Sequence, residues 1–416
     1  MVWKMKKLGL IGYPLGHSWS REIHQYFTKQ KYELFPLEEK DMIDFLKSKD
    51  FDGLNVTIPY KETVIPYLDE LDDGAKEIGA VNCIVNQNGK LKGYNTDYLG
   101  FKQMLVSNHI SVNEGLVALL GTGGARKACE KALHDLGANT ITVSRSASKG
   151  ITYDELYTRE KEISVIVNTT PVGMKPDYDG LPIDLDKFTN LKAVIDVVAN
   201  PIMTRLQFEA KMRNITYLGG FEMLVRQALV ADKLFFEKEF DDTLVQPCMQ
   251  EVLKEKRNVV LIGMPTSGKS TIAKVLAEQT GNTLVEMDDE LVNEFGTSIK
   301  EVFAQKGETY FRDAETELTK KLRDKEKCII SCGGGVIKRE ENMRNLNHNG
   351  IVIWLDRSVD KLYGTSSRPL CKDDDAIGKL YNERKDLYQK YADVRVENNG
   401  TLEETVEKVI QLIGGK

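Results

Sequence analysis

This chain of 416 residues lacks several sequence features, and each absence excludes a class of protein before any motif is considered. Its six cysteines are scattered, form no C-x-x-C pair and have no histidine at zinc-ligand spacing, so we expect reduced structural thiols. No apolar run approaches the about 18 to 20 residues that span a bilayer. The apolar run that starts at Leu8 ends too early for a signal peptide. We therefore expect a cytoplasmic protein.

An excess of positive charge is also missing. Lys and Arg total 57 against 63 Asp and Glu, a net charge of -6, so no overall field favours a nucleic-acid backbone or an anionic membrane. Any anionic ligand must be held by a few placed residues. We expect small-molecule partners, no nucleic acid and no membrane, with monomer and homodimer both open.

The chain has no internal repeat, no low-complexity tract and no Gly- or Ser-rich linker, while its length exceeds that of one usual domain. Short apolar runs alternate with amphipathic stretches, which predicts an α/β fold with mainly parallel sheets. A hairpin over residues 81–94 should turn at Asn88-Gly89. The expected strands are 8–13, 32–37, 52–58, 116–120, 140–144, 164–168, 193–198, 258–262 and 284–287, and the expected helices include 21–31, 42–48, 125–136 and 222–239.

A phosphate-binding pattern follows the strand expected at 258–262. It reads Gly263-Met264-Pro265-Thr266-Ser267-Gly268-Lys269-Ser270, and a helix should start near Thr271. This is G-x-x-x-x-G-K-[ST] in its strand, loop and helix context. Backbone N–H groups of such a loop surround a polyphosphate, Lys269 adds positive charge, and Ser270 can hold Mg²⁺.

Further motifs follow the phosphate loop in a fixed order. They are Asp288 after the strand expected at 284–287, Gly307-Glu308, Phe311-Arg312, Gly333-Gly334-Gly335, Arg368-Pro369-Leu370 and Arg384. Together these segments closely resemble shikimate kinase, and the resemblance covers residues 257–416. It implies ATP and Mg²⁺ as cofactors, with residues 263–271 and Arg368 on the nucleotide.

The resemblance also implies roles for single residues. Asp288 would accept the proton of the substrate hydroxyl, while Lys269 and Arg368 would act on the phosphates. Arg312 and Arg384 would grip the substrate carboxylate, since a guanidinium fork matches a planar anion. Gly333, Gly334 and Gly335 would lie against the ring. Two features depart from the family: Glu286, expected to hold Mg²⁺ through water, replaces the usual aspartate, and the lid segment between Arg368 and Arg384 is short.

A second glycine cluster, Gly121-Thr122-Gly123-Gly124-Ala125, lies between the strand expected at 116–120 and the helix expected at 125–136. That position places a pyrophosphate on the helix N-terminus. The next strand ends in Ser144-Arg145-Ser146, with an arginine where an NAD site would carry an acid. The sequence therefore favours NADP.

Motifs around this glycine cluster resemble shikimate dehydrogenase, in the order 12–20, 55–62, 79–82, 95–97, 168–174 and 222–227. The resemblance implies further NADP contacts from Asn168, Thr169 and Gly220. It also implies a pocket for a polyhydroxylated cyclic acid, formed by Ser18, Ser20, Asn55, Thr57, Lys61, Asn82, Asp97 and Gln227.

Lys61 and Asp97 would be the catalytic pair. Lysine is an ammonium donor at pH 7, so Lys61 would protonate the oxygen that receives the hydride, with Asp97 orienting it. Ala199 stands where the family usually has tyrosine.

The product that the resemblance implies for the first half, shikimate, is also the substrate that it implies for the second half. We therefore expect a bifunctional enzyme with a substrate-binding lobe over 1–100, on which a helix within 220–250 packs back, a Rossmann NADP-binding lobe over 101–250 and a P-loop kinase domain over 257–416. Two alternatives stay open. One is an NAD-linked quinate or shikimate dehydrogenase, and the other is a nucleotide-binding regulatory protein whose kinase half has lost activity.

Overall fold

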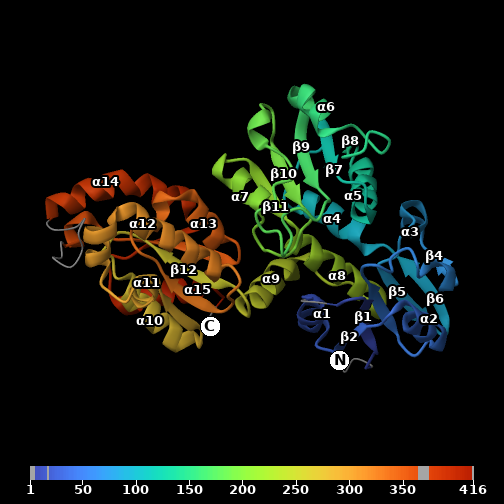
Figure 1. Ribbon diagram of the computed structural model, residues 1–416. Coiled ribbons are helices and arrows are strands. Elements are labelled where there is room, and N and C mark those ends of the chain that lie inside the picture. Colours follow the sequence, from blue (N-terminus) through green and yellow to red (C-terminus); the bar gives the residue numbers. More distant parts are fainter. Residues whose placement is uncertain (1–4, 16–17, 364–373, 415–416) are drawn as a thin grey trace. The chain divides into compact units, whose positions relative to one another are not determined.

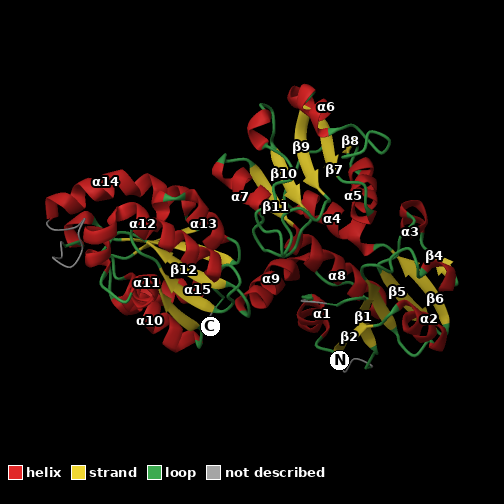
Figure 2. Cartoon of the chain, in the orientation of Figure 1, coloured by secondary structure: helices red, strands yellow, loops and turns green. Residues whose placement is uncertain are grey.

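The computed structural model describes residues 5–15, 18–363 and 374–414 (Figure 1). Contacts divide the chain into two compact units, the first ending at Val252 and the second starting at Leu253. Three sheets lie among helices (Figure 2), which confirms the expected α/β class. Among the described residues, every helix is too short or too polar to cross a membrane.

The first lobe of unit 1 has a mixed sheet in the order β2-β1-β3-β5-β6-β4. Strand β1 is parallel to both β2 and β3, whereas β5 is antiparallel to β3 and β6. The expected hairpin is confirmed, because Asn88 and Gly89 both have positive φ between β5 and β6. The elements are β1 (Leu8–Gly12), α1 (Ser20–Thr28), β2 (Tyr32–Pro36), α2 (Glu39–Ser48), β3 (Gly53–Val56), β4 (Glu70–Leu71), α3 (Asp73–Ile78), β5 (Cys83–Gln87) and β6 (Lys90–Tyr94).

The second lobe of unit 1 has a fully parallel sheet in the order β11-β10-β9-β7-β8. The strand order reverses beside β7, and ligands of open parallel sheets bind at such a point, outside the carboxyl ends of the strands. The elements are α4 (Thr96–Ser107), β7 (Leu116–Leu120), α5 (Gly124–Asp135), β8 (Asn139–Val143), α6 (Tyr153–Thr158), β9 (Ile163–Asn168), β10 (Ala193–Asp196), α7 (Arg205–Met212), β11 (Thr216–Gly219), α8 (Gly220–Phe236) and α9 (Val245–Lys254).

Helix α8 belongs to the cores of both lobes. Its Met223 packs in the core of the second lobe, whereas Ala231 and Phe235 pack against Leu8 and other residues of the first. A Cβ added at Gly53 in β3 would come within 2.4 Å of the Phe235 ring, so this glycine lets helix and sheet approach closely. Helix α8 therefore joins the two lobes into one unit.

Unit 2 has a five-stranded parallel sheet in the order β13-β14-β12-β15-β16. Its central strand β12 carries the phosphate loop at its carboxyl end. The elements are β12 (Asn258–Ile262), α10 (Lys269–Thr280), β13 (Thr283–Glu286), α11 (Met287–Phe295), α12 (Ile299–Leu322), β14 (Cys328–Ser331), α13 (Glu340–Asn347), β15 (Gly350–Asp356), α14 (Asp374–Tyr391), β16 (Val394–Glu397) and α15 (Leu402–Leu412).

One expected boundary in unit 2 is corrected. The strand predicted for 284–287 ends at Glu286, and Met287 already begins α11. Asp288 therefore lies in the first turn of a helix and not at a strand end. Acidic side chains suit this position because the N-terminal end of a helix carries partial positive charge.

Candidate active sites

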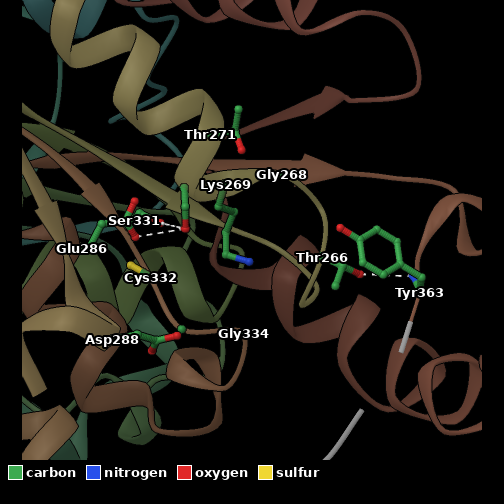
Figure 3. A pocket seen from close by; sticks show the side chains of 12 residues that line it. Thr266, Gly268, Lys269, Thr271, Glu286, Asp288, Ser331, Cys332, Gly334 and Tyr363 are labelled. Carbon is green, nitrogen blue, oxygen red and sulfur yellow. Dashed lines mark hydrogen bonds between the residues drawn. The ribbon is translucent and has the colours of Figure 1, made fainter. Parts of the chain in front are cut away.

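A polar pocket of about 270 Å³ opens beside the phosphate loop of unit 2 (Figure 3). Four separate parts of the chain line it: the loop and start of α10, the junction of β13 with α11, the end of β14 with the glycines after it, and Tyr363. The lining residues are Thr266, Gly268, Lys269, Ser270, Thr271, Glu286, Asp288, Ser331, Cys332, Gly333, Gly334 and Tyr363. The fold thus brings six of the predicted nucleotide and metal residues next to Asp288 and two of the predicted substrate glycines.

The phosphate loop is shaped by glycine at two points. Gly263 has φ 150° and lies so close to β15 that an added Cβ would be 2.6 Å from the Leu355 carbonyl oxygen. Gly268 has φ 90° and caps α10. The Lys269 side chain is buried and its Nζ donates to the carbonyl oxygens of Gly263 at 3.0 Å and Met264 at 2.8 Å. The ammonium is therefore held directly over the loop that precedes it.

The two residues predicted to hold Mg²⁺ are neighbours. Ser270 Oγ donates to Glu286 Oε2 at 3.1 Å, and burial raises the pKa of the Glu286 carboxyl. A hydroxyl and a carboxylate are oxygen ligands of the kind that Mg²⁺ prefers. In the described residues, no cluster of three or more His, Cys, Asp or Glu side chains forms a metal site. A serine hydroxyl and one carboxylate beside a phosphate loop fit Mg²⁺, which is usually held by one or two protein oxygens together with waters and phosphates.

Asp288 lies against the glycine loop after β14. A Cβ added at Gly333 would be 2.9 Å from Asp288 Oδ1, and one added at Gly334 would be 2.8 Å from the Pro265 ring. The glycines let the phosphate loop and the carboxylate approach the same segment. A carboxylate beside the phosphate-binding residues can accept a proton from a bound hydroxyl.

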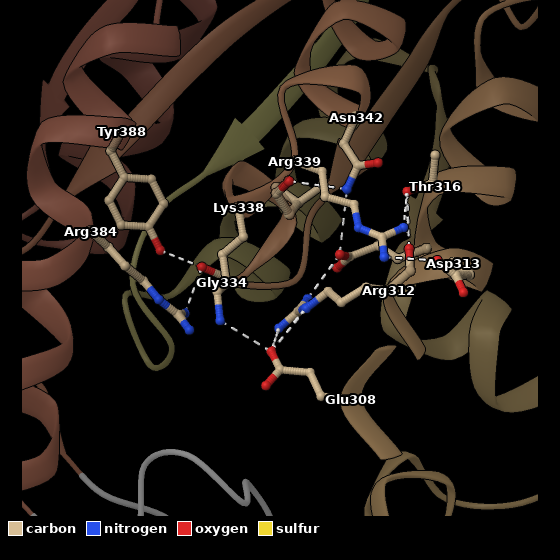
Figure 4. A network of polar contacts seen from close by, with 12 residues as sticks. Glu308, Arg312, Asp313, Thr316, Gly334, Lys338, Arg339, Asn342, Arg384 and Tyr388 are labelled. Carbon is tan, nitrogen blue, oxygen red and sulfur yellow. Dashed lines mark hydrogen bonds and ion pairs between the residues drawn. The ribbon is translucent and has the colours of Figure 1, made fainter. Parts of the chain in front are cut away.

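Arg312 takes part in a buried network of ion pairs (Figure 4). Its Nη1 donates to Glu315 Oε2 at 2.8 Å, and its Nε and Nη2 both donate to Glu308 Oε1 at 3.2 Å. A Cβ added at Gly335 would lie 2.3 Å from the Arg312 guanidinium, so glycine makes room for it. Burial raises the pKa of Glu315 even though Arg312 is adjacent. Much of the Arg312 fork is already engaged by carboxylates of the chain.

Arg384 differs from Arg312 in that part of its fork has no partner. Its side chain comes from α14, is 2% exposed, and donates from Nη1 to the Gly334 carbonyl oxygen at 2.8 Å. The same oxygen accepts from the Tyr388 hydroxyl at 2.6 Å (Figure 4). Within the part of the chain that the structure describes, Nε and Nη2 of Arg384 are buried and have no hydrogen-bond partner. Unpaired buried donors are costly, so these two atoms are set to receive an anion.

One predicted catalytic residue, Arg368, lies outside the described residues. Of the segment between Arg368 and Arg384, only the part that starts at Asp374, in α14, is described. Of the other predicted nucleotide contacts, Met264, Pro265 and Ser267 belong to the loop without lining the pocket. The Ser267 carbonyl oxygen accepts from Asn398 Nδ2 at 2.5 Å, which ties the loop to the end of β16. These residues therefore support the loop from behind.

A second pocket, of about 740 Å³, lies at the reversal of strand order in unit 1. The predicted residues Gly121, Thr122, Gly123, Ser144, Arg145, Ser146 and Thr169 line it. Gly124 and Ala125 follow as the first residues of α5, so the glycine turn opens a helix N-terminus toward the pocket. Gly121 has φ 109° and no room for a side chain beside Thr169 and Thr170. The arrangement fits a dinucleotide.

Asn168 lies beneath this pocket in a fully buried polar group. Its Nδ2 donates to Asp196 Oδ1 at 2.9 Å, and its Oδ1 accepts from the backbone and hydroxyl of Thr170. Thr204 Oγ1 donates to Asp196 Oδ2 at 2.7 Å. Burial raises the pKa of Asp196 to about 6, although these hydrogen bonds lower it. Asn168 thus holds the loop that lines the pocket.

Gly220 has a packing role. It begins α8 behind β10, where an added Cβ would lie 2.2 Å from the Val197 carbonyl oxygen. It is not among the residues that line the dinucleotide pocket. The close approach explains why a glycine is needed at this position.

Lys61 of the first lobe and Asp97 at the start of α4 form a half-buried ion pair, with Lys61 Nζ 2.6 Å from Asp97 Oδ2. Their side chains are 31% and 17% exposed. Asp97 stands in the first turn of α4, and the Lys61 carbonyl oxygen accepts from Val81 N at 2.7 Å. The partly open pair can exchange a proton with a bound molecule.

Three of the predicted amide side chains share one buried network beside this pair. Asn82 Nδ2 donates to Thr96 Oγ1 at 3.0 Å and lies 3.4 Å from Gln227 Oε1, while Asn55 Nδ2 donates to the Asn82 carbonyl oxygen at 3.3 Å. Thr96 N donates to Asn82 Oδ1 at 2.6 Å. The network joins β3, the start of β5, α4 and α8.

The remaining predicted substrate residues lie at the ends of β1 and β3. Thr57 N donates to the Ile11 carbonyl oxygen at 2.9 Å, and Ser18 Oγ accepts from Ser20 N at 3.2 Å at the start of α1. Both strands are parallel and end at the same edge of the sheet. Thr57 therefore lies with Asn55 at this edge, whereas the two serines belong to the start of α1.

Sequence motifs did not reveal every residue of these sites. Thr96 completes the amide network, and Lys149, Tyr153, Thr170, Val172 and Leu181 line the dinucleotide pocket. Lys149 lies four residues after Arg145, so a second basic residue after the strand end was a usable signal. Tyr363 lines the phosphate pocket, and its N donates to Thr266 Oγ1 at 3.3 Å. Nothing in the local sequence marks this tyrosine.

Known proteins resemble both units. Residues 265–414 match the family model for shikimate kinase, and residues 10–84 match the model for the shikimate dehydrogenase substrate binding domain. The shikimate dehydrogenase (NADP(+)) of Clostridium beijerinckii is 39% identical over 259 residues, which cover 58% of this chain and 96% of that protein. That of Halothermothrix orenii is 41% identical over 259 residues, covering 55% and 90%.

Solved structures match the dehydrogenase part. A chorismate mutase/shikimate 5-dehydrogenase fusion protein from Clostridium acetobutylicum has a TM-score of 0.57 and 32% identity, covering 61% of this chain and 98% of its own. Shikimate 5-dehydrogenase from Thermus thermophilus, in complex with NADP(H) and shikimate, has a TM-score of 0.55 and 28% identity, covering 60% and 100%. The chain therefore belongs to the shikimate dehydrogenase family and carries, fused behind that part, a shikimate kinase domain.

Proposed function

We propose that the protein catalyses two consecutive steps: NADPH-dependent reduction of 3-dehydroshikimate to shikimate, and ATP-dependent phosphorylation of shikimate to shikimate 3-phosphate. The observation that carries the proposal is the pocket of unit 2, which joins a phosphate loop to Asp288 and two glycines, with the unpaired edge of Arg384 behind Gly334. A hydroxylated carboxylic acid is the kind of substrate that such a site requires. The Lys61–Asp97 pair supports the reduction. The five described cysteines, all buried and free, support a reducing cytoplasm.

In the first step, the dinucleotide supplies the hydride when bound, and the residues of this chain position the substrate and the proton. Arg145 and Lys149, both exposed at the rim of the pocket, suit a 2′-phosphate, so NADPH is preferred to NADH. The Lys61 ammonium protonates the oxygen of the ketone while Asp97 keeps the ammonium in place. Asn55, Asn82 and Gln227 bind the hydroxyls.

In the second step, ATP supplies the phosphoryl group, and positioning and charge do most of the catalytic work. Lys269 stabilises phosphate charge, and Ser270 with Glu286 would hold Mg²⁺. Asp288 accepts the proton of the attacking hydroxyl. Arg384 binds the substrate carboxylate through Nε and Nη2, with Arg312 contributing its remaining N–H groups.

Two variants of the full chain test the proposal. We expect Lys61→Met to abolish NADPH oxidation with 3-dehydroshikimate and to leave phosphorylation of shikimate unchanged, since Lys61 belongs to unit 1. We expect Lys269→Met to do the reverse. Each variant is the folding control of the other. Wild-type protein that neither oxidises NADPH with 3-dehydroshikimate nor consumes ATP with shikimate contradicts the proposal.

A further inference from the structure

A chain of four buried side chains runs from α8 to the predicted substrate residue Asn55, and its other three members are used by none of the steps above. Asp232, His24, Tyr32 and Asn55 are between 0% and 4% exposed. His24 Nδ1 lies 2.8 Å from Asp232 Oδ1, and the His24 ring stacks on the Tyr32 ring with centroids 4.2 Å apart and planes 7° from parallel. The Tyr32 hydroxyl donates to Asn55 Oδ1 at 2.8 Å.

The tyrosine hydroxyl determines which way the Asn55 carboxamide faces. An asparagine side chain has an oxygen and a nitrogen of nearly equal size, and its hydrogen-bond partners decide between the two orientations. Here the oxygen accepts from Tyr32, and one N–H of Nδ2 donates to the Asn82 carbonyl oxygen at 3.3 Å. The second N–H is left as a donor. Asn55 can therefore offer a directed N–H to a substrate oxygen.

Tyr32 is held as a permanent donor. Burial raises the pKa of its hydroxyl well above the usual range, and the nearby Asp232 and Cys83 raise it further. The hydroxyl is thus protonated throughout any practical assay range. The ring that carries it is fixed on one side by His24, which Asp232 of α8 holds in turn. The same helix presents Gln227 to the Asn82 network.

We propose that Tyr32 is a positioning residue of the dehydrogenase, which sets the Asn55 carboxamide as a donor to the substrate, and that His24 and Asp232 fix the Tyr32 ring for this purpose. The inference deepens the proposed reduction and rests on it. Because Tyr32 acts through Asn55, its contribution is to substrate binding and not to proton or hydride transfer.

The test removes only the hydroxyl, with Tyr32→Phe in the full chain. We expect the KM for 3-dehydroshikimate to rise about tenfold, the effect of one unsatisfied buried acceptor, with kcat within about twofold. The KM for NADPH should not change. Tyr60→Phe is the matched control, because Tyr60 is another buried tyrosine of the lobe whose hydroxyl donates to a backbone oxygen, that of Leu37, at 2.8 Å. It should lose similar thermal stability with no change in KM.

A double-mutant cycle then separates positioning from general damage. In an Asn55→Ala background, Tyr32→Phe should cause no further rise in KM, and the smaller rise expected for Asp232→Asn should disappear in the Tyr32→Phe background. If the rises in KM of Tyr32→Phe and Asn55→Ala multiply in the double variant, the inference for Tyr32 is overturned. The same result for Asp232→Asn and Tyr32→Phe overturns the inference for Asp232. If wild-type protein reduces 3-dehydroshikimate but Tyr32→Phe keeps the wild-type KM, only the positioning inference fails. If wild-type protein lacks the activity, the proposed function fails and this inference with it.

Discussion

Arg384→Lys is the most informative single change in the kinase domain. It keeps the positive charge in a 2%-exposed position but removes the planar fork, of which Nε and Nη2 have no partner among the described residues. If a substrate carboxylate binds across these two atoms, lysine forfeits one charge-assisted hydrogen bond, worth about 1.5 to 3 kcal/mol. That loss corresponds to about 10- to 150-fold in affinity for shikimate.

The assay is ATP consumption with shikimate varied at saturating ATP and Mg²⁺, together with calorimetric titration of shikimate. We expect both the KM and the Kd for shikimate to rise by this factor, with the KM for ATP unchanged. Arg339→Lys is the matched control, because Arg339 pairs with Asp313 at 2.7 Å and donates to Thr316 away from the pocket.

Arg312→Lys gives the sharper comparison. The guanidinium of Arg312 is already bonded to Glu308 and Glu315, so it has fewer donors to lose and should show the smaller rise in KM. Two results would refute the reasoning: a KM for shikimate within about twofold of wild type in Arg384→Lys, or a larger rise in Arg312→Lys than in Arg384→Lys.

Three further predictions concern unit 1. Asp97→Asn should lower the dehydrogenase kcat by a factor of about 10² or more, because the Lys61 ammonium loses the carboxylate that holds it. A kcat near that of wild type would contradict the orienting role of Asp97. Arg145→Ala should raise the KM for NADPH about tenfold and leave the KM for NADH unchanged, since only NADPH carries the 2′-phosphate; equal changes with both cofactors count against it. Asp196 has a folded pKa of about 6 against 3.8 when exposed, so its stabilising contribution is present at low pH and lost as pH rises through 6. Between pH 5 and 7.5, wild type should therefore lose on the order of 1 kcal/mol of unfolding free energy relative to Asp196→Asn, as measured by urea unfolding. Parallel pH dependences of the two proteins would contradict the burial argument.

The architecture could be predicted because its signals are local. The phosphate loop, the glycine turn after β7 and the Asn88-Gly89 hairpin each combine a backbone requirement with a fixed spacing, and the structure places them as expected. The end of the strand predicted for 284–287 was misplaced by one residue, because a strand end and a helix start share one short apolar run.

The arrangement within the sites could be predicted only in part. The resemblance gave Arg312 and Arg384 the same role. Only the folded chain shows that Arg312 is bonded to Glu308 and Glu315, whereas Nε and Nη2 of Arg384 have no partner among the described residues. In the same way, Asp232 and His24 are separated by 208 residues and have no spacing pattern to connect them. Long-range pairing of this kind depends on how elements pack and not on the sequence around either residue.

Helix α8 also affects the order in which the protein can fold during synthesis. The sheet of the first lobe needs Ala231 and Phe235 to cover β1 and β2, and His24 needs Asp232. Strand β3 ends at Val56 and α8 at Phe236, a separation of 180 residues. At ribosomal rates of about 5 to 20 residues per second, α8 is synthesised about 10 to 40 seconds after β3, and the apolar face that α8 covers stays exposed for that time. The opening segment is thus made first but can complete its core only after α8 has been made.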